Sequence, residues 1–173
     1  MTRRLVLLLV LLGSTLEAQQ TAGYRAKPET LPREIAAQPV AFSHRVHSAA
    51  GATCLDCHRN AKSRSRAGLP QADDCMLCHR AIAGEHPVVR EVAAMAEQEK
   101  AIEWVRAYRV PDFVFFSHKE HLAAKIECVA CHGAVAERDV TAQEVSTQMT
   151  VCMNCHQARG ASNECSLCHE LGQ

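Results

Sequence analysis

Five copies of one short cysteine pattern constrain this chain of 173 residues more than any other feature of its sequence. Each copy reads Cys-x-x-Cys-His, and together the copies use all ten cysteines. We number them motifs 1 to 5 along the chain. They are Cys54-Leu-Asp-Cys57-His58, Cys75-Met-Leu-Cys78-His79, Cys128-Val-Ala-Cys131-His132, Cys152-Met-Asn-Cys155-His156 and Cys165-Ser-Leu-Cys168-His169. Because no cysteine is left over, one chemistry should account for all ten thiols.

The pattern is the attachment signature of c-type haem. Two thiols three positions apart share one helical turn and can reach the two vinyl groups on one edge of a porphyrin. The histidine that follows then presents its imidazole to the iron as the proximal ligand. The sequence therefore predicts five covalent haems c, with His58, His79, His132, His156 and His169 as proximal ligands.

Other uses of cysteine pairs explain the pattern less well. A disulfide scaffold does not need a histidine after every second cysteine. Zinc ribbons combine two pairs into a four-cysteine site, and five pairs do not divide that way. A thioredoxin-like redox pair occurs once in a chain, within a βαβ unit.

The histidine count suggests how the second face of each iron is closed. Five of the ten histidines belong to the motifs, and the remaining five are candidates for distal ligands. These are His44, His47, His86, His118 and His121. Methionine is the alternative axial ligand. Of Met76, Met95, Met149 and Met153, Met149 is the best placed, because Met76 and Met153 lie inside attachment loops.

Four of these candidates lie in an internal duplication. Phe42-Ser43-His44-Arg45-Val46-His47 recurs as Phe116-Ser117-His118-Lys119-Glu120-His121. Motif 3 follows motif 1 at the same offset, and motif 4 follows motif 2 at a slightly larger one. Histidines at positions i and i+3 lie on one face of a helical turn, so each pair can serve two neighbouring haems. We expect the two phenylalanines to pack against porphyrin.

The candidates are unevenly distributed between the two copies. The first half offers three distal histidines for two haems, and the second offers two for three. If every iron has two histidine ligands, at least one first-half histidine must ligate a second-half haem. The halves would then be joined through iron and would not be independent domains.

The predicted fold is mostly α-helical with much irregular structure, in which short helices and long loops surround a core of haem. Aromatic residues make up only 4% of the chain, so side chains alone supply little to pack. We expect an extended arm at residues 19–41, a dihaem half at 42–87, a linking helix at 88–110 and a trihaem half at 111–173. In the linking segment, apolar residues recur at helical spacing from Val88 to Val105, and Pro111 ends the run.

The segment 1–18 has the pattern of a secretory signal peptide. Arg3 and Arg4 precede an apolar run from Leu5 to Leu12, and Ala18 provides a small residue for cleavage. A retained membrane anchor is the alternative, but a span needs about 20 apolar residues. Because of this signal-peptide pattern, we expect an exported, periplasmic protein. A formal net charge of zero gives no electrostatic reason to expect nucleic acid as a partner.

The Phe-x-His-x-x-His segments, each followed by Cys-x-x-Cys-His motifs, resemble the class III cytochromes c, small multihaem proteins of the periplasm. The resemblance covers residues 42–169 and implies low-potential haems with two histidine ligands and a role in electron transfer. It also implies that His44 and His118 serve the haems of motifs 1 and 3, whereas His47 and His121 serve other haems. The second half, from Trp104 to His169, is also similar to the pentahaem subunits of membrane-bound quinol-oxidising complexes. Those subunits typically carry a membrane anchor, and the short apolar run departs from that pattern.

Three functions compete on these grounds. The leading one is a periplasmic electron carrier that exchanges electrons with redox partner proteins. The second is a redox subunit of a membrane quinol-oxidising or reductase complex. The third is a multihaem reductase, which needs an iron with an open position. Because the spare histidines suffice to close all five irons, we do not expect an enzyme.

Overall fold

The computed structural model describes residues 30–33 and 37–170. In this part of the chain, short helices are joined by long irregular segments. They are α1 (His44–Ala49), α2 (Cys54–Cys57), η1 (Arg59–Lys62), α3 (Ala72–His79), α4 (Pro87–Glu97), α5 (His118–Ala123), α6 (Val129–His132), η2 (Val135–Glu137), α7 (Met149–Arg159) and η3 (Cys165–Leu167), where η marks a 3-10 helix. Extended pairing in the described residues is limited to two isolated bridges, Arg33–Gln143 and Val114–His169. The predicted fold class is confirmed.

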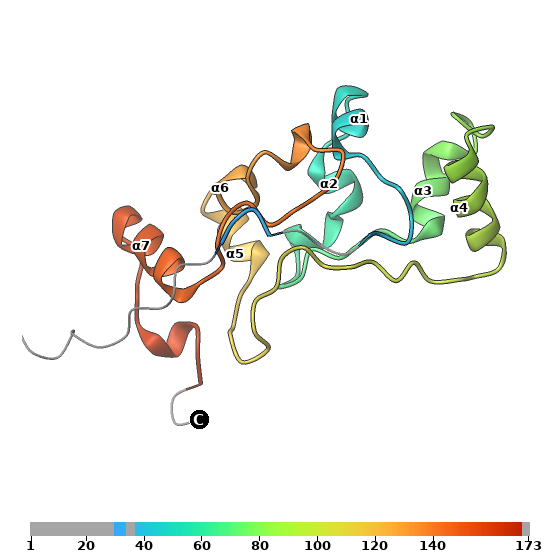
Figure 1. Ribbon diagram of the computed structural model, residues 1–173. Helices are drawn as coiled ribbons and strands as arrows, with labels where there is room; N and C mark the ends of the chain where they lie inside the picture. Colours follow the sequence, from blue (N-terminus) through green and yellow to red (C-terminus); the bar gives the residue numbers. More distant parts are fainter. Residues whose placement is uncertain (1–29, 34–36, 171–173) are drawn as a thin grey trace, which may run out of the picture.

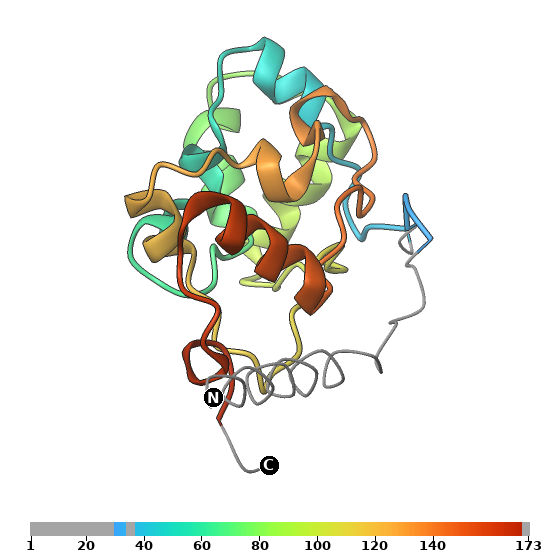
Figure 2. The ribbon, with the colours of Figure 1, turned by 90° about the vertical axis from the view of Figure 1, so that its left-hand side faces the viewer.

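The helices are strung along an elongated molecule (Figure 1). Helices α3 and α4 lie at one end, and α7 and the C-terminal segment lie at the other. Helices α1, α2, α5 and α6 occupy the middle. In the turned view of Figure 2, α7 lies in front of the first-half helices.

Local capping explains where the short helices begin. The hydroxyls of Ser43 and Ser117 accept hydrogen bonds from backbone N–H groups in the first turns of α1 and α5. The backbone N–H of Gln71 donates to the carboxylate of Asp74 at 2.8 Å, which fixes the start of α3. Helix α7 ends at Gly160, which adopts the left-handed conformation common after helices.

A small apolar core lies where α3 packs against α4. Its buried members are Val40, Ala72, Met76, Val92 and Ile102. Partly buried side chains, among them Val88 and Trp104, pack against it. The core therefore lies at the α3–α4 end of the molecule.

The predicted helix from 88 to 110 is wrong in its second part. Helix α4 ends at Glu97, and Glu99 adopts a positive φ of 51°, which a helix cannot continue through. The chain then runs extended, with the backbone N–H of Ile102 donating to the Gln71 side chain at 2.7 Å and the Trp104 indole donating to the Pro70 carbonyl at 2.7 Å. The apolar residues of this segment reach the core from an extended chain, and their helical spacing is coincidental.

The described part of the N-terminal arm crosses between the two halves. Arg33 forms its backbone bridge with Gln143, and the Gln38 side chain bonds both the N–H and the carbonyl of Val105, each at 3.0 Å. The predicted signal peptide lies outside the described residues. In the part of the chain that the structure describes, no helix has the length and apolar character needed to cross a membrane.

Candidate haem sites

All five motifs present their thiols on short helical segments. Motifs 1 to 4 lie on or beside α2, α3, α6 and α7, and motif 5 lies on η3. All ten cysteines are free, and each is at least partly exposed. Within the described residues, no group of three or more His, Cys, Asp or Glu side chains converges as a metal ion would require.

Three motif histidines face a second histidine at nearly the same separation. The ring centroids are 6.0 Å apart for His47 and His79, 6.3 Å for His118 and His132, and 6.2 Å for His121 and His156. An ion bound to two imidazole nitrogens at about 2 Å separates ring centroids by roughly 6 Å. The gaps therefore fit one iron between each pair.

At motif 1 the corresponding two histidines are also neighbours. His44 and His58 interact electrostatically: burial lowers the pKa of His44, and the neighbouring imidazoles of His58 and His47 lower it further. In the first copy of the repeat, His44 and His58 occupy the positions that His118 and His132 occupy in the second. The structure thus sets His47, His118 and His121 opposite motifs 2, 3 and 4. The repeat and the neighbourhood of His58 assign His44 to motif 1.

The two distal helices share one local geometry. In α1 the Nδ1 of His47 donates to the Ser43 carbonyl at 2.8 Å, and Phe42 stacks on the His47 ring with centroids 4.3 Å apart. In α5 the equivalent hydrogen bond from His121 to the Ser117 carbonyl is also 2.8 Å, and Phe116 lies 4.8 Å from the His121 ring. Each phenylalanine therefore orients the histidine pair of its own helix.

Backbone carbonyls also hold Nδ1 of four other candidate ligands. Their distances are His58 to Gly68 at 2.8 Å, His79 to Ile82 at 3.1 Å, His118 to Ser65 at 2.6 Å and His156 to Ser162 at 2.7 Å. A carbonyl can only accept, so Nδ1 carries the proton and Nε2 keeps its lone pair for a metal. Metal-binding histidines commonly have such a partner, which fixes ring orientation and tautomer.

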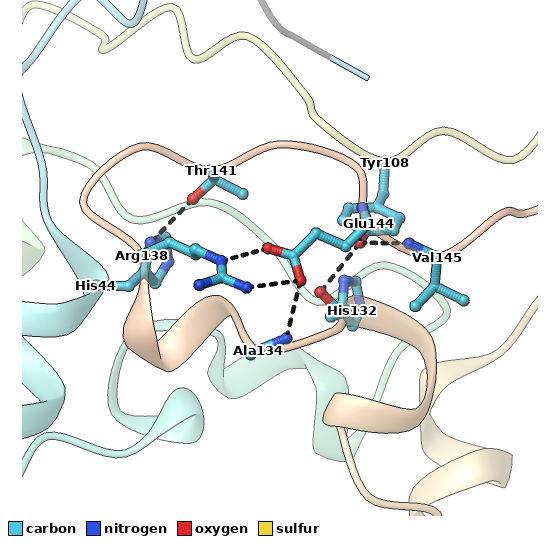
Figure 3. A network of polar contacts seen from close by, with 8 residues as sticks. All are labelled: His44, Tyr108, His132, Ala134, Arg138, Thr141, Glu144 and Val145. Atoms are coloured by element: carbon cyan, nitrogen blue, oxygen red, sulfur yellow. Dashed lines mark hydrogen bonds and ion pairs between the residues drawn. The ribbon is translucent and has the colours of Figure 1, made fainter. Parts of the chain in front are cut away.

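A loop between η2 and α7 ties sites of the two halves together (Figure 3). The Thr141 hydroxyl hydrogen-bonds Nδ1 of His44 at 3.1 Å. At the other side of the loop, the Tyr108 hydroxyl donates to the His132 carbonyl at 3.0 Å and accepts from the N–H of Glu144 at 2.9 Å. We call the haem site at each motif by the number of that motif. Candidate ligand residues of sites 1 and 3, His44 and His132, are thereby attached to the same loop.

An ion pair inside this loop fixes its shape. Arg138 Nε donates to Glu144 at 2.5 Å, and the N–H of Ala134 donates to the same carboxylate at 3.2 Å (Figure 3). The hydrogen bond from Arg138 lowers the pKa of Glu144. Gly133 allows this approach, because its φ is +68° and an added Cβ would lie 2.8 Å from Glu144 Cβ. A second ion pair, Arg45–Asp139 at 2.6 Å, joins the loop to α1.

Interactions between thiols of different motifs indicate which motifs are neighbours. Burial is the main cause of each raised pKa, and a thiol of an adjacent motif raises it further. The pairs are Cys57 with Cys78, Cys75 with Cys57, Cys128 with Cys54, Cys131 with Cys155, and Cys152 with Cys168. In space the motifs therefore follow the order 2, 1, 3, 4, 5.

The histidine at the centre of this series has a strongly lowered pKa. Burial, together with the nearby imidazoles of His118 and His58, lowers the pKa of His132 to about 4. The ring of Tyr108 lies edge-on to His132 with centroids 4.6 Å apart. In the structure, Tyr108 therefore anchors a proximal histidine through both its ring and its hydroxyl.

For His86 the structure shows a role other than the predicted distal ligand. It is the N-cap of α4, where its Nδ1 accepts a hydrogen bond from the N–H of Val88 at 3.3 Å. Helix α4 lies at the opposite end of the molecule from motif 5 (Figure 1). His86 therefore lies away from motif 5, and the link through iron from a first-half histidine to a second-half haem stays a prediction. The halves are joined by the arm and the loop contacts described above.

The backbone partners of the histidines could not be predicted from the sequence. The carbonyls of Gly68, Ser65 and Ser162 carry no signal in their residue type. Thr141 and Glu144 lie in a segment that has no motif. The internal repeat offered one signal: Ser43 and Ser117 occupy equivalent positions, so the sequence could have predicted that they cap their helices in the same way.

Two features define a multihaem c-type cytochrome. Its short helices present pairs of free thiols, and its imidazoles face one another across gaps that have room for one iron. The comparisons agree. The model of the class III cytochrome C family matches residues 20–106, half of the chain, and that of cytochrome c7 and related cytochrome c matches residues 114–170. The chain belongs to the class III cytochrome c family, whose members carry covalent haem c and transfer electrons. No curated protein matches it.

Proposed function

We propose that this protein is a periplasmic cytochrome with five haems, which relays electrons along a line in the order of motifs 2, 1, 3, 4 and 5. The observation that carries the proposal is the repeated gap of 6.0–6.3 Å between a motif histidine and a second histidine. Three independent pairs at one spacing, from two copies of a repeat, favour a common occupant between them.

Haem supplies one-electron chemistry, and the polypeptide supplies position and environment. The thiols fix each porphyrin edge to a helix. The carbonyls at Nδ1 of His47, His58 and His118 hold the rings in the tautomer that can bind iron. Because two protein ligands close an iron, sites 1 to 4 are suited to electron transfer without binding a substrate.

The line is supported by the neighbouring thiols and by the order of the helices. In Figure 1, α3, α2, α6 and α7 follow one another along the molecule. Each neighbouring pair of motifs also shares at least one thiol interaction, for example Cys128 with Cys54. We place exchange with redox partner proteins at the two ends, where motifs 2 and 5 lie.

Haem count and export can be tested together on the mature protein. We expect an intact mass that corresponds to the chain from Gln19 with five covalent haems. Four haems, or a chain that keeps Arg3 and Arg4, would contradict the count or the cleavage, respectively. Variants in which serine replaces both cysteines of one motif should each lose one haem.

The order of the line can be tested by removing one haem at a time. Replacing Cys128 and Cys131 by serine removes the haem of site 3. The remaining haems should then form two groups, and after partial reduction electrons should equilibrate within each group but not between them. Replacing Cys75 and Cys78 removes an end and should leave one group. Stopped-flow absorption after rapid sub-stoichiometric reduction distinguishes the two. Equal behaviour of the two variants would contradict the proposed order.

A further inference from the structure

Motif 5 differs from the other four in what faces its histidine. The ring opposite His169 belongs to Phe113, with centroids 6.0 Å apart and an interplanar angle of 29°. This separation equals that of His47 and His79. A phenyl ring therefore stands at the separation where motifs 2, 3 and 4 have an imidazole, and it has no lone pair to offer a metal.

No histidine of the chain remains for this position. All ten lie within the described residues. His47, His118 and His121 face motifs 2, 3 and 4, His44 neighbours His58 of motif 1, and the fifth candidate is His86. His86 caps α4 at the far end of the molecule (Figure 1).

The backbone holds Phe113 beside motif 5. The N–H of Phe115 donates to the Cys168 carbonyl at 2.8 Å, and Val114 forms an isolated bridge with His169. A hydrogen bond from the N–H of Val114 to the Pro111 carbonyl at 3.0 Å closes the turn that carries Phe113. Phe113 is 64% exposed in the polypeptide, so its ring is accessible beside motif 5.

We propose that site 5 has His169 as its sole protein ligand, and that Phe113 shields an open position on the other face of the iron. This inference rests on the proposed function and adds to it a binding site for a small neutral molecule such as carbon monoxide. The surroundings favour a neutral ligand. Phe113, Phe115 and Leu167 are apolar, and an anion would lose its hydration beside them without a compensating partner.

The mature protein can be titrated with carbon monoxide in its fully reduced state. We expect one molecule bound per chain of five haems, and one high-spin haem among four low-spin ones in the oxidised spectrum. Five haems that are all low-spin and bind no carbon monoxide would overturn the inference while leaving the proposed function intact. A spectral signature of methionine ligation, with Met149 as the expected source, would overturn it as well. A haem count below five would instead contradict the proposed function.

A pair of substitutions in one segment tests the role of Phe113. Phe113→His should provide the missing ligand, so carbon monoxide binding should fall from one per chain to none and the high-spin signal should disappear. Phe115→His is the matched control, because Phe115 is similarly exposed, at 57%, and forms no ring contact with His169 in the described structure. It should retain one bound molecule per chain. Equal binding by the two variants would overturn the assignment of Phe113, and their haem counts show whether each has matured.

Discussion

The two halves repeat one ligand geometry but differ in what surrounds it. The first half, together with the arm and the linking segment, has a core of buried side chains. Its members include Val40, Met76, Val92 and Ile102. Among the described residues of the second half, the one fully buried side chain is polar, that of Gln143. Helix α7 buries none of its residues. The ligand arrangement therefore does not depend on a conventional core.

Equivalent methionines show the difference most directly. Met76 and Met153 each follow the first cysteine of their motif, at equivalent positions of motifs 2 and 4. Met76 is 8% exposed and Met153 is 39% exposed. The first half can thus gain stability from side-chain packing, whereas the second must gain it from haem and from polar contacts.

Removing the second-half haems should have the largest effect. We expect serine at all six second-half cysteines to unfold α5, α6 and α7, because an isolated helix of this length is marginal in water. Helix α4 should stay protected by its core. Hydrogen exchange of the two regions measures this, and a protected α7 without haem would contradict the contrast between the halves.

Truncating the equivalent methionines should separate the halves by packing alone. Met76→Ala should lower the free energy of unfolding by about 2–5 kcal/mol, as for other buried methionines. Met153→Ala should change it by about 0.5 kcal/mol or less, as for surface positions. Denaturant unfolding of both mature variants gives the comparison, and equal losses would show that haem covers Met153 as fully as side chains cover Met76.

Removing one hydroxyl should test the polar contacts of the second half. Tyr108→Phe loses the acceptor for the N–H of Glu144 and the donor to the His132 carbonyl. We expect a loss of about 1–3 kcal/mol, because part-buried backbone groups are left without partners. Faster hydrogen exchange at Glu144 and Val145 would locate the effect. Unchanged exchange there would contradict the role of Tyr108.

One repeat position offers a small gain in stability. Gly51 and Lys125 are equivalent, and both have a positive φ, of 93° and 56°. Glycine tolerates this conformation, whereas lysine is strained in it. Lys125→Gly should stabilise the second half by roughly 0.5–1 kcal/mol. Ala124→Gly, at an ordinary φ of −77°, should do the opposite, and thermal unfolding of the two variants checks the sign.

The sequence predicted most of the ligand pattern because that pattern is local. The spacing of Cys57 and His58, and of His44 and His47, lies within one helical turn, where geometry follows from residue number. The class of fold followed from the same motifs. The pairing of His47 with motif 2 and of His121 with motif 4 was outside that reasoning, since it depends on how the chain returns over longer distances.

Where the sequence reasoning failed, longer-range contacts decided the outcome. The helical spacing after Gln98 was overridden by hydrogen bonds from the side chains of Gln38 and Gln71, which hold the segment extended. The histidine count treated His86 as able to reach any iron, whereas the structure places it at the start of α4, at the opposite end of the molecule from motif 5.

The place of motif 1 between motifs 2 and 3 has a consequence for biogenesis. If the chain is exported with its N-terminus first and carries five haems, as we propose, the earliest haem would join at an interior position of the series and the next at one extremity. The other three would then extend the series in the opposite direction. A chain whose synthesis stops after residue 110 would contain motifs 1 and 2 only. It would have the end of the series that serves one redox partner and lack the haems that lead to the other partner.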